Sequence, residues 1–309
     1  MAHQSTAVMG AGPLVSVILP SYGMGKFIRQ ALESIGSQTH ANWEVILIDD
    51  CGPEDGTREA LQEFRNSHPS RRVEYLRNKE NVGCGESRNV GMDAARGEYF
   101  AFLDPDDFWG PGYLEASLEG IGNGDLCFPG VRLVDDQGAD LGSRMGGRME
   151  ELRGSFPSSL FVENFLLPSC TVIHRRVREV IGGFDPNRDV MYAADWDFYL
   201  RCIAGGQRFV LLKEEHCYYR KHQGAATGNY LQMTCECAKV LKKNWKTSKG
   251  VMKARLKESL HAHLSKLAYL KISFRDWSGL GDAAGACLLS PWNLEPYRSL
   301  FKGLKNNWK

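Results

Sequence analysis

The feature that most constrains the fold is a strict alternation of strand-like and helix-like segments over the first 110 residues. Short β-branched and aromatic runs alternate with amphipathic segments such as 25–39, in which Phe27, Ile28, Leu32 and Ile35 recur at helical spacing. The predicted strands are 13–22, 43–52, 72–78 and 98–107, and the predicted helices are 25–39, 57–66 and 87–97. This order predicts an α/β fold with a doubly wound, mostly parallel sheet and helices on both faces.

Polar residues collect where these predicted strands end. The four strand ends carry Pro20-Ser21-Tyr22, Asp49-Asp50, Asn81 to Gly85, and Asp104-Pro105-Asp106. In doubly wound sheets, ligands bind outside the carboxyl ends of the strands. Solubility alone does not explain the clustering, because turns at the opposite edge would serve it equally well. We therefore expect a binding site at this edge.

The sequence "FLDPDD" places three carboxylates within four positions directly after an apolar run. Like charges this close raise one another's pKa and are unfavourable unless they share a cation. A divalent metal ion is one explanation. A solvated acidic turn in which Asp107 caps the next helix is the other, and the motif by itself leaves both open.

Composition is typical of a globular protein of 309 residues, with 43% hydrophobic residues. No window approaches the roughly 18 apolar residues of a membrane span, and the first apolar run lacks the preceding basic residues of a signal peptide. The nine cysteines lack a disulfide framework, which favours reduced thiols. We therefore expect a cytoplasmic protein, with peripheral attachment to the inner face of a membrane as an option.

The net charge of +1 conceals an asymmetric distribution. Residues 239–309 contain 15 Lys and Arg against 4 Asp and Glu, while residues 1–238 are acidic. The basic part also has a predicted helical face with Leu256, Leu260, Leu264 and Leu267. Two explanations remain: contact with an anionic membrane, or leucines that pack on the protein or on a second copy in a homo-oligomer. No nucleic-acid partner is expected.

Four stretches in order resemble the motifs of family 2 glycosyltransferases with the GT-A fold. They are "VSVILPSYGMGKFIRQALESIGSQTHANWEVILIDDCGPEDGT", "NVGCGESRNVGMDAARGEYFAFLDPDD", "GGFDPNRDVMYAADWDFYLRCIAGG" and "YRKHQGA". The resemblance covers about two thirds of the chain, from Val15 to Gly224. It implies transfer of a sugar from a nucleotide-sugar, with UDP favoured, to a hydroxyl of a glycan or lipid-linked acceptor, with inversion and a divalent cation, Mn²⁺ or Mg²⁺.

The resemblance also implies roles for individual residues of the donor site. Asp106 and His222 would bind the metal, and Asp104 the metal or the ribose. A cation there stabilises the charge that develops on the leaving diphosphate. Without the motif, His222 would be taken for an ordinary surface histidine. The residues implied to meet the nucleotide-sugar are Pro20, Ser21, Tyr22, Asp50, Gly83, Arg88 and Asp104.

Three of these residues have specific expected contacts. Tyr22 would pack on the base, and Asp50 would accept a hydrogen bond from N3 of a pyrimidine. Arg88 is expected either to reach the donor or to form a salt bridge within the protein. Core packing is the alternative for Tyr22.

An inverting transfer needs a base that deprotonates the acceptor hydroxyl. The family carries it on the aspartate of a Glu-Asp pair, which matches Asp195 here, although Ala194 replaces the glutamate. Asp197 is the rival, but two residues further along a helix it should point elsewhere.

Two other functions are weighed against this one. A nucleotidyltransferase also uses acidic metal ligands on such a sheet, but the phosphate loop it needs is missing after the first strand. A non-catalytic sugar-nucleotide-binding module is left open by Ala194. The predicted division is a flexible N-terminus at 1–12, a catalytic domain at 13–228 with a nucleotide-binding half (13–110) and an acceptor half (111–228), and a basic helical C-terminal region at 229–309.

Overall fold

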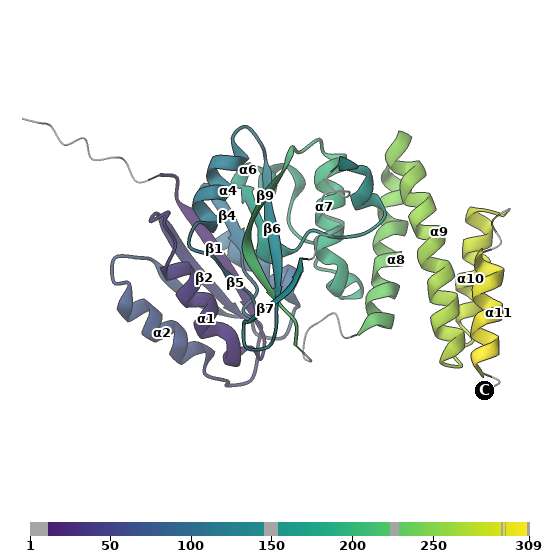
Figure 1. Cartoon of the computed structure of the whole chain (residues 1–309), viewed down its shortest axis with the longest axis horizontal. Coiled ribbons are helices and arrows are strands. Elements are labelled where there is room, and N and C mark those ends of the chain that lie inside the picture. The colour runs from purple at the N-terminus through teal and green to yellow at the C-terminus, as the bar shows by residue number, and fades with distance from the viewer. Residues whose placement is uncertain (1–11, 145–153, 223–228, 292, 294, 308–309) are drawn as a thin grey trace, which may run out of the picture.

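A computed structural model describes residues 12–144, 154–222, 229–291, 293 and 295–307, and in these residues the chain forms a twisted sheet flanked by helices with a helical extension (Figure 1). The predicted alternation in the first 110 residues is confirmed. Its elements are β1 (Val15–Ser21), α1 (Gly25–Gly36), β2 (Trp43–Asp49), α2 (Thr57–Ser67), β3 (Val73–Arg77), α3 (Cys84–Ala94) and β4 (Tyr99–Phe102).

These four strands form the parallel part of the sheet. β1 lies between β2 and β4, with Ile18 aligned to Ile46 on one side and to Phe102 on the other. β3 adds to the outer edge of β2 in the same direction. Every residue of β1 and β2 is buried, as expected for parallel strands covered by helices on both faces. The carboxyl ends of β1, β2 and β4 therefore meet at one edge.

The second half of the sheet is mixed. In the described residues its order continues from β4 through β8, β6 and β9 to β5, and β7 pairs with β6 as an antiparallel hairpin. β9 runs parallel to β6 but antiparallel to β5. The elements are β5 (Phe108–Trp109), α4 (Tyr113–Ile121), β6 (Leu126–Val134), β7 (Asp140–Arg144), η1 (Ser158–Phe161), η2 (Pro168–Cys170), β8 (Thr171–His174), α6 (Arg175–Ile181), η3 (Arg188–Ala193), α7 (Ala194–Ala204) and β9 (Phe209–Arg220).

The two faces of the sheet carry separate hydrophobic cores. Val17 and Leu19 pack under α1, α2 and α4, whereas Ile18 between them faces the opposite side, where α3 and α7 lie. This alternation follows from the two-residue period of a strand. Helices thus cover both faces, as the sequence predicts.

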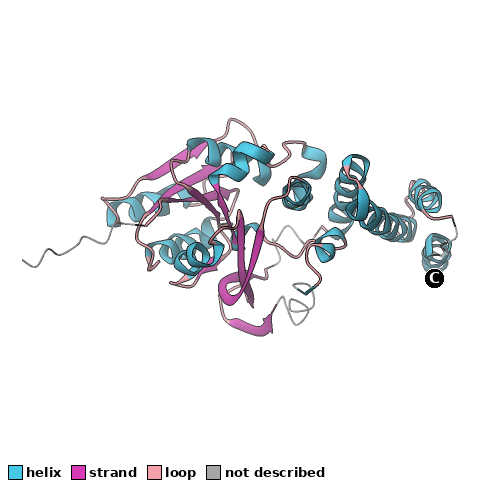
Figure 2. Ribbon diagram, turned by 90° about the horizontal axis from the view of Figure 1, so that it is seen from above, coloured by secondary structure: helices cyan, strands magenta, loops and turns pink. Residues whose placement is uncertain are grey.

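The C-terminal region consists of α8 (Tyr230–Thr247), α9 (Gly250–Ser273), α10 (Gly279–Leu289) and α11 (Glu295–Asn307). Seen from above in Figure 2, these helices extend from one side of the sheet toward the C-terminus. Leu256, Leu260 and Leu267 are buried in the same core as Ile18, and Leu264 packs against it. The core is therefore continuous across the predicted boundary at residue 228.

The leucines of this helical face were predicted either to contact a membrane or to pack on protein, and their burial decides between the two. They pack on the protein, so the face predicted as a possible membrane surface is not available to lipid. Apolar side chains are exposed elsewhere in the region, at Phe274, Trp277 and Leu288. None of the helices in the described part of the chain combines the length and apolar character needed to span a bilayer.

The predicted flexible N-terminus, apart from residue 12, and most of the glycine- and arginine-rich stretch 142–154 fall outside the described residues.

Candidate active site

The acidic end of β4 is enclosed by the protein rather than solvated. Asp107 is buried, and its Oδ1 accepts a hydrogen bond of 2.9 Å from the backbone N–H of Arg220. Asp104 forms an ion pair with Arg88, whose side chain is only 3% exposed. Asp106 lies 3.0 Å from Nε2 of His222. The solvated acidic turn is therefore wrong for this segment.

His222 comes to Asp106 from the end of β9, far along the chain. Its ring packs against Phe27 of α1 with 4.9 Å between centroids, and its side chain is largely buried. The expectation of an ordinary surface histidine is not met. Two of the three side chains predicted to bind metal are therefore in direct contact.

Arg220 connects the acidic segment after β4 with the loop after β6, and the sequence did not predict this role. Its Nε donates to the carbonyl oxygen of Asp106 at 2.8 Å, and its guanidinium also reaches the carbonyl of Asp136 at 2.8 Å. The same group lies over the rings of Phe27 and Phe108. Its position two residues before His222 in "YRKH" was the only signal available, and nothing local marks that arginine as buried.

Burial leaves these carboxylates poorly solvated. Desolvation and the charge of Asp104 raise the pKa of Asp106, although the hydrogen bond from His222 opposes the shift. Desolvation together with the charges of Asp106 and Asp104 raises the pKa of Asp107 well above its usual range. Both pKa shifts have the same origin. Among the described residues, the three carboxylates of Asp104, Asp106 and Asp107 contact only two side chains that can carry a positive charge, Arg88 and His222. A bound cation would relieve this deficit of positive charge.

The donor atoms fit a divalent cation that shares its ligands with a substrate. A carboxylate and an imidazole in contact offer two protein ligands, and Mg²⁺-type sites commonly take one or two protein carboxylates plus substrate phosphates. Among the described residues, no three Asp, Glu, His or Cys side chains converge as a complete metal site. The predicted third ligand, Asp104, instead points to Arg88. Asp106 and His222 are thus the pair that would hold a metal.

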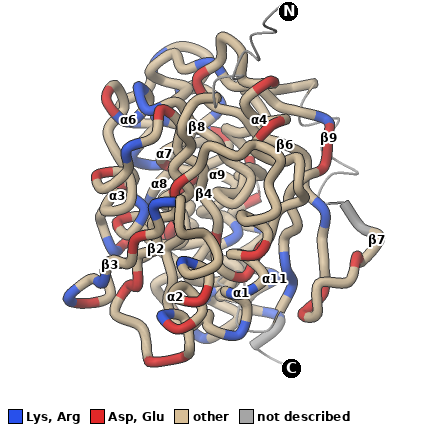
Figure 3. Tube along the Cα trace, turned by 90° about the vertical axis from the view of Figure 1, so that its left-hand side faces the viewer, with Lys and Arg blue, Asp and Glu red and all other residues tan. Residues whose placement is uncertain are grey.

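Residues predicted to meet the nucleoside lie at the ends of β1 and β2. Pro20 and Ser21 are buried, whereas the side chain of Tyr22 is 53% exposed. The core alternative for Tyr22 is therefore wrong, and an exposed ring is free to stack on a base. Figure 3 views the molecule from the α2 side and shows acidic residues in several loops at the lower edge of the sheet, where β1 and β2 end.

Asp50 has a different environment from the one the resemblance implies. It is 3% exposed, and its oxygens accept hydrogen bonds of 2.8 Å from Asn78 and from the backbone N–H groups of Val82 and Gly83. These bonds shape the loop that precedes α3, where Gly83 takes a φ of 89°. In this structure the carboxylate organises the loop, and its contact with a pyrimidine stays a prediction.

Arg88 takes the second of its two expected roles here. Although burial alone would lower its pKa, Asp104 raises it, so the guanidinium stays charged. Its Nε is buried without a hydrogen-bond partner among the described residues. Arg88 thus forms an ion pair with Asp104 and also interacts electrostatically with Asp195.

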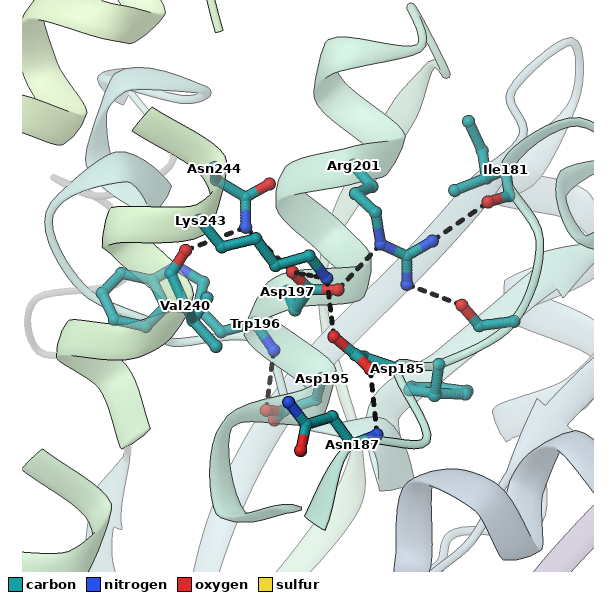
Figure 4. Close-up of polar contacts among 12 residues, drawn as sticks. Ile181, Asp185, Asn187, Asp195, Trp196, Asp197, Arg201, Val240, Lys243 and Asn244 are labelled. Carbon is teal, nitrogen blue, oxygen red and sulfur yellow. Dashed lines mark hydrogen bonds and ion pairs between the residues drawn. The ribbon is translucent and has the colours of Figure 1, made fainter. Parts of the chain in front are cut away.

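The two aspartates at the start of α7 point in different directions (Figure 4). Asp197 is 0% exposed and is bound by Arg201 at 2.8 Å, by Lys243 at 2.9 Å and by Asn244 at 2.9 Å. Lys243 and Asn244 belong to α8, so Asp197 joins α7 to the C-terminal region. All its charge is compensated inside the fold, which removes it as a candidate base.

Asp195 is only partly buried and lacks a cation in direct contact among the described residues. Desolvation raises its pKa to about 6, while the charge of Arg88 and hydrogen bonds from the Trp196 N–H and Asn164 oppose the shift. A carboxyl group with this pKa is a stronger base than an ordinary aspartate and still ionised at neutral pH.

Ala194, which stands where the family has glutamate, is buried against α3. A Cβ placed on Gly85 would lie 3.1 Å from the Ala194 Cβ, so the two helix starts are in close contact. Asn164, which the sequence analysis did not identify, contacts Asp195.

Comparison with known proteins gives the same family that the sequence motifs resemble. The family model "Glycosyl transferase family 2" matches residues 16–181. A putative teichuronic acid biosynthesis glycosyltransferase, TuaG of Bacillus subtilis, is 44% identical over 131 residues, which are 42% of this chain and 51% of that protein. The uncharacterized glycosyltransferase MJ1057 of Methanocaldococcus jannaschii is 27% identical over 77% of this chain and 81% of its own.

Solved structures share the fold. TarS of S. aureus, residues 1–349 in complex with UDP, has a TM-score of 0.63 at 19% identity, over 94% of this chain and 88% of its own. The mannosyltransferase PcManGT of Pyrobaculum calidifontis, in complex with GDP-Man and Mn²⁺, has a TM-score of 0.65 at 18% identity, over 96% and 87%.

The sheet topology and these neighbours show a fold of the GT-A type. The chain belongs to glycosyl transferase family 2.

Proposed function

We propose that this protein transfers a sugar from a nucleoside-diphosphate sugar, with UDP favoured, to a hydroxyl group of a glycan or lipid-linked acceptor, with inversion at the anomeric carbon. The observation that carries the proposal is that two incompletely compensated carboxylates, Asp106 and Asp195, both lie close enough to the Arg88–Asp104 pair for their pKa values to respond to its charges. One suits the donor diphosphate and the other the acceptor hydroxyl.

On the donor side, Asp106 and His222 would hold a divalent cation. When bound, it supplies positive charge to the leaving diphosphate. Tyr22 offers its exposed ring to the base, and Pro20 and Ser21 present the turn beneath it. The loop at Gly83 lets the backbone approach the donor, and the charge of Arg88 favours an anionic ligand.

On the acceptor side, Asp195 would accept the proton of the attacking hydroxyl. Its pKa of about 6 leaves it mostly ionised at neutral pH. Inversion requires only this single displacement, so one base is enough.

Relatives support the choice of donor and acceptor. A protein of Escherichia coli named as a UDP-Glc:α-D-GlcNAc-diphosphoundecaprenol β-1,3-glucosyltransferase, WfgD, is 36% identical over 115 residues, 37% of this chain and 44% of its own. TarS has been solved with UDP-GlcNAc, and PcManGT with GDP-Man and Mn²⁺. Membership of the family argues against the nucleotidyltransferase and the non-catalytic module.

A donor screen tests the proposal. Thermal unfolding would be followed with UDP-glucose, UDP-GlcNAc, GDP-mannose and dTDP-glucose, each with Mn²⁺ or with EDTA. A donor at a hundredfold excess over its Kd stabilises the fold by about 2.7 kcal/mol. We expect a UDP-sugar to raise the Tm only with Mn²⁺. Equal shifts in EDTA would contradict the metal, and a shift with GDP-mannose alone would contradict the preference for UDP.

A further inference from the structure

We propose that Asn164 is a positioning residue that fixes the orientation of the Asp195 carboxylate. The inference rests on the proposed role of Asp195 as the base. Asn164 Nδ2 donates a hydrogen bond of 2.9 Å to Asp195 Oδ2. The other oxygen, Oδ1, accepts one of 2.7 Å from the backbone N–H of Trp196. Each oxygen thus has one internal donor and keeps a lone pair for an acceptor hydroxyl.

The orientation of the Asn164 amide is set by its own chain. Its Oδ1 accepts a hydrogen bond of 3.3 Å from the backbone N–H of Leu166, two residues later. With the oxygen engaged there, the NH₂ group faces Asp195. The arrangement is therefore a donor directed at a carboxylate, which is stronger than a bond between neutral groups.

The segment that carries Asn164 is held on both sides. The carbonyl of Leu160 accepts a hydrogen bond of 2.7 Å from the indole N–H of Trp196, so the segment is tied to α7 next to the base. The carbonyl of Val162 accepts one of 3.2 Å from Ser259 of α9. Phe161 and Phe165 are buried in the core that α9 completes. The C-terminal helices therefore support the base through Asn164.

This contact gives Asp195 a side-chain donor in a chain whose preceding residue, Ala194, cannot provide one. In the family motif a glutamate precedes the base, whereas here Ala194 packs against Gly85. A hydrogen bond donated to the ionised form of a carboxyl group stabilises that form. Without Asn164, Asp195 Oδ2 would lose its donor, and only the Trp196 backbone N–H would hold the carboxylate.

Other charged and titratable groups also face Asp195. Arg88 on α3 lowers its pKa, and Asp104 at the end of β4 raises it. Burial raises the pKa values of Cys84 on α3, Tyr199 on α7 and Cys237 on α8, and the charge of Asp195 adds to each shift. Arg88 keeps its charge throughout the range of interest, so it does not move with the substitution at Asn164.

Titration of Asp195 itself gives a test that needs no acceptor. Protein labelled with ¹³C at the aspartate carboxyl groups would be titrated by NMR, with the resonance assigned by its loss in Asp195→Asn. We expect the midpoint, near 6 in the wild type, to rise by about 1 unit in Asn164→Leu, since a hydrogen bond to a charged group contributes on the order of 1.5 kcal/mol or more. Asn164→Asp, which keeps the size but replaces the donor with a negative charge, should raise it further.

Kinetics separate this inference from the function it rests on. With UDP-GlcNAc, Mn²⁺ and water as the acceptor, release of UDP should fall about tenfold in Asn164→Leu at pH 6.5, while the KM for the donor changes less than twofold. Asn42→Leu is the matched control, because Asn42 also donates one hydrogen bond, of 2.6 Å, but at the amino-terminal edge of the sheet. It should leave the midpoint and kcat unchanged.

The outcomes are distinct. If Asp195→Asn abolishes UDP release while Asn164→Leu and Asn164→Asp leave the midpoint and kcat at their wild-type values, the positioning role is overturned and the base stands. If Asp195→Asn keeps wild-type kcat, the base assignment fails and the positioning role fails with it. Raised midpoints in both Asn164 variants, with a reduced kcat, support both.

Discussion

The acidic end of β4 and the beginning of α7 carry the same Asp-x-Asp spacing, in Asp104-Pro-Asp106 and Asp195-Trp-Asp197. In each pair one aspartate is ion-paired with arginine or lysine, and the other has a raised pKa and no arginine or lysine in contact among the described residues. Asp104 and Asp197 are the paired members. Asp106 and Asp195 are the members whose charge the fold does not compensate.

Burial and the presence of a counter-charge distinguish aspartates that stabilise the fold from aspartates that are available for catalysis or metal binding. A buried ion pair that is fully hydrogen-bonded contributes to the fold, and breaking it leaves an uncompensated charge. A carboxylate that is desolvated without a permanent cation is costly to keep, and such residues gather at functional sites. The five predictions below test whether this distinction holds.

The largest effect is expected at Asp106. Asp106→Asn removes the charge that would hold a divalent cation, so transfer should fall by ~10³ or more, and the Mn²⁺-dependent shift in Tm with UDP-sugar should disappear. The Tm without ligand should change little, because no arginine or lysine is left unpaired. Asp93→Asn, on the exposed side of α3, is the control. Normal turnover of Asp106→Asn in EDTA would refute the metal assignment.

Asp195→Asn should lower kcat by ~10² to 10⁴, because the amide cannot accept the acceptor's proton. Donor affinity should stay close to that of the wild type, since the role proposed for Asp195 is on the acceptor. Steady-state kinetics and thermal shift with UDP-sugar measure the two quantities. A variant that lost donor binding and kept kcat would move Asp195 to the nucleotide.

Asp197→Ala should have the opposite effect, lowering the stability of the fold with little change in kcat. It removes the carboxylate shared by Arg201 and Lys243, which are partly exposed and keep other partners, so the free energy of unfolding should fall by about 1.5 to 3 kcal/mol. The kcat of the protein that remains folded should change little. Chemical denaturation and active-site titration measure the two. A stable Asp197→Ala protein without activity would reverse the comparison.

The pH dependence of kcat should follow Asp195. Because its folded pKa is raised to about 6, the carboxyl group is protonated and inactive as a base below that pH, and ionised above it. With rate-limiting chemistry, kcat at pH 5 should be roughly a tenth of its plateau. A profile that is flat down to pH 4.5 would remove the base role.

The smallest effect concerns residues 239–309, where 15 Lys and Arg stand against 4 Asp and Glu. In Figure 1 the turn between α9 and α10 lies on the same lower side as the carboxyl end of β1. There the exposed Phe274 and Trp277 flank Arg275 and Asp276, and we propose that the rings and the Arg275 guanidinium contact an anionic lipid surface.

Co-sedimentation with liposomes tests this contact. Each basic residue near the headgroups contributes about 1 kcal/mol, so Arg275→Glu should weaken binding to anionic vesicles by at least about fivefold at low salt. Neutral vesicles and high salt are the controls. Equal, negligible pelleting on both vesicle types would leave the region with a packing role only.

Much of the fold could be predicted from the sequence, because the relevant information is local. The two-residue and 3.6-residue periods of apolar side chains mark the elements from β1 to β4, and their alternation determines a parallel sheet. Such a sheet brings Tyr22, Asp50 and Asp106 to one edge. The sequence by itself therefore determined the class of fold, the edge that carries the site and the chemical character of that edge.

The tertiary structure decided which partner each polar group has. Asp106 meets His222 from 116 positions away, and Asp195 meets Asn164 from 31 positions away. It also decided that Asp50 is turned inward, that Asp197 is an internal ion pair, and that the leucines of α9 are core. These outcomes depend on contacts between distant segments, and no local period encodes them. Burial and the choice of counter-charge, which determine whether an aspartate is structural or chemical, exist only once the chain has packed.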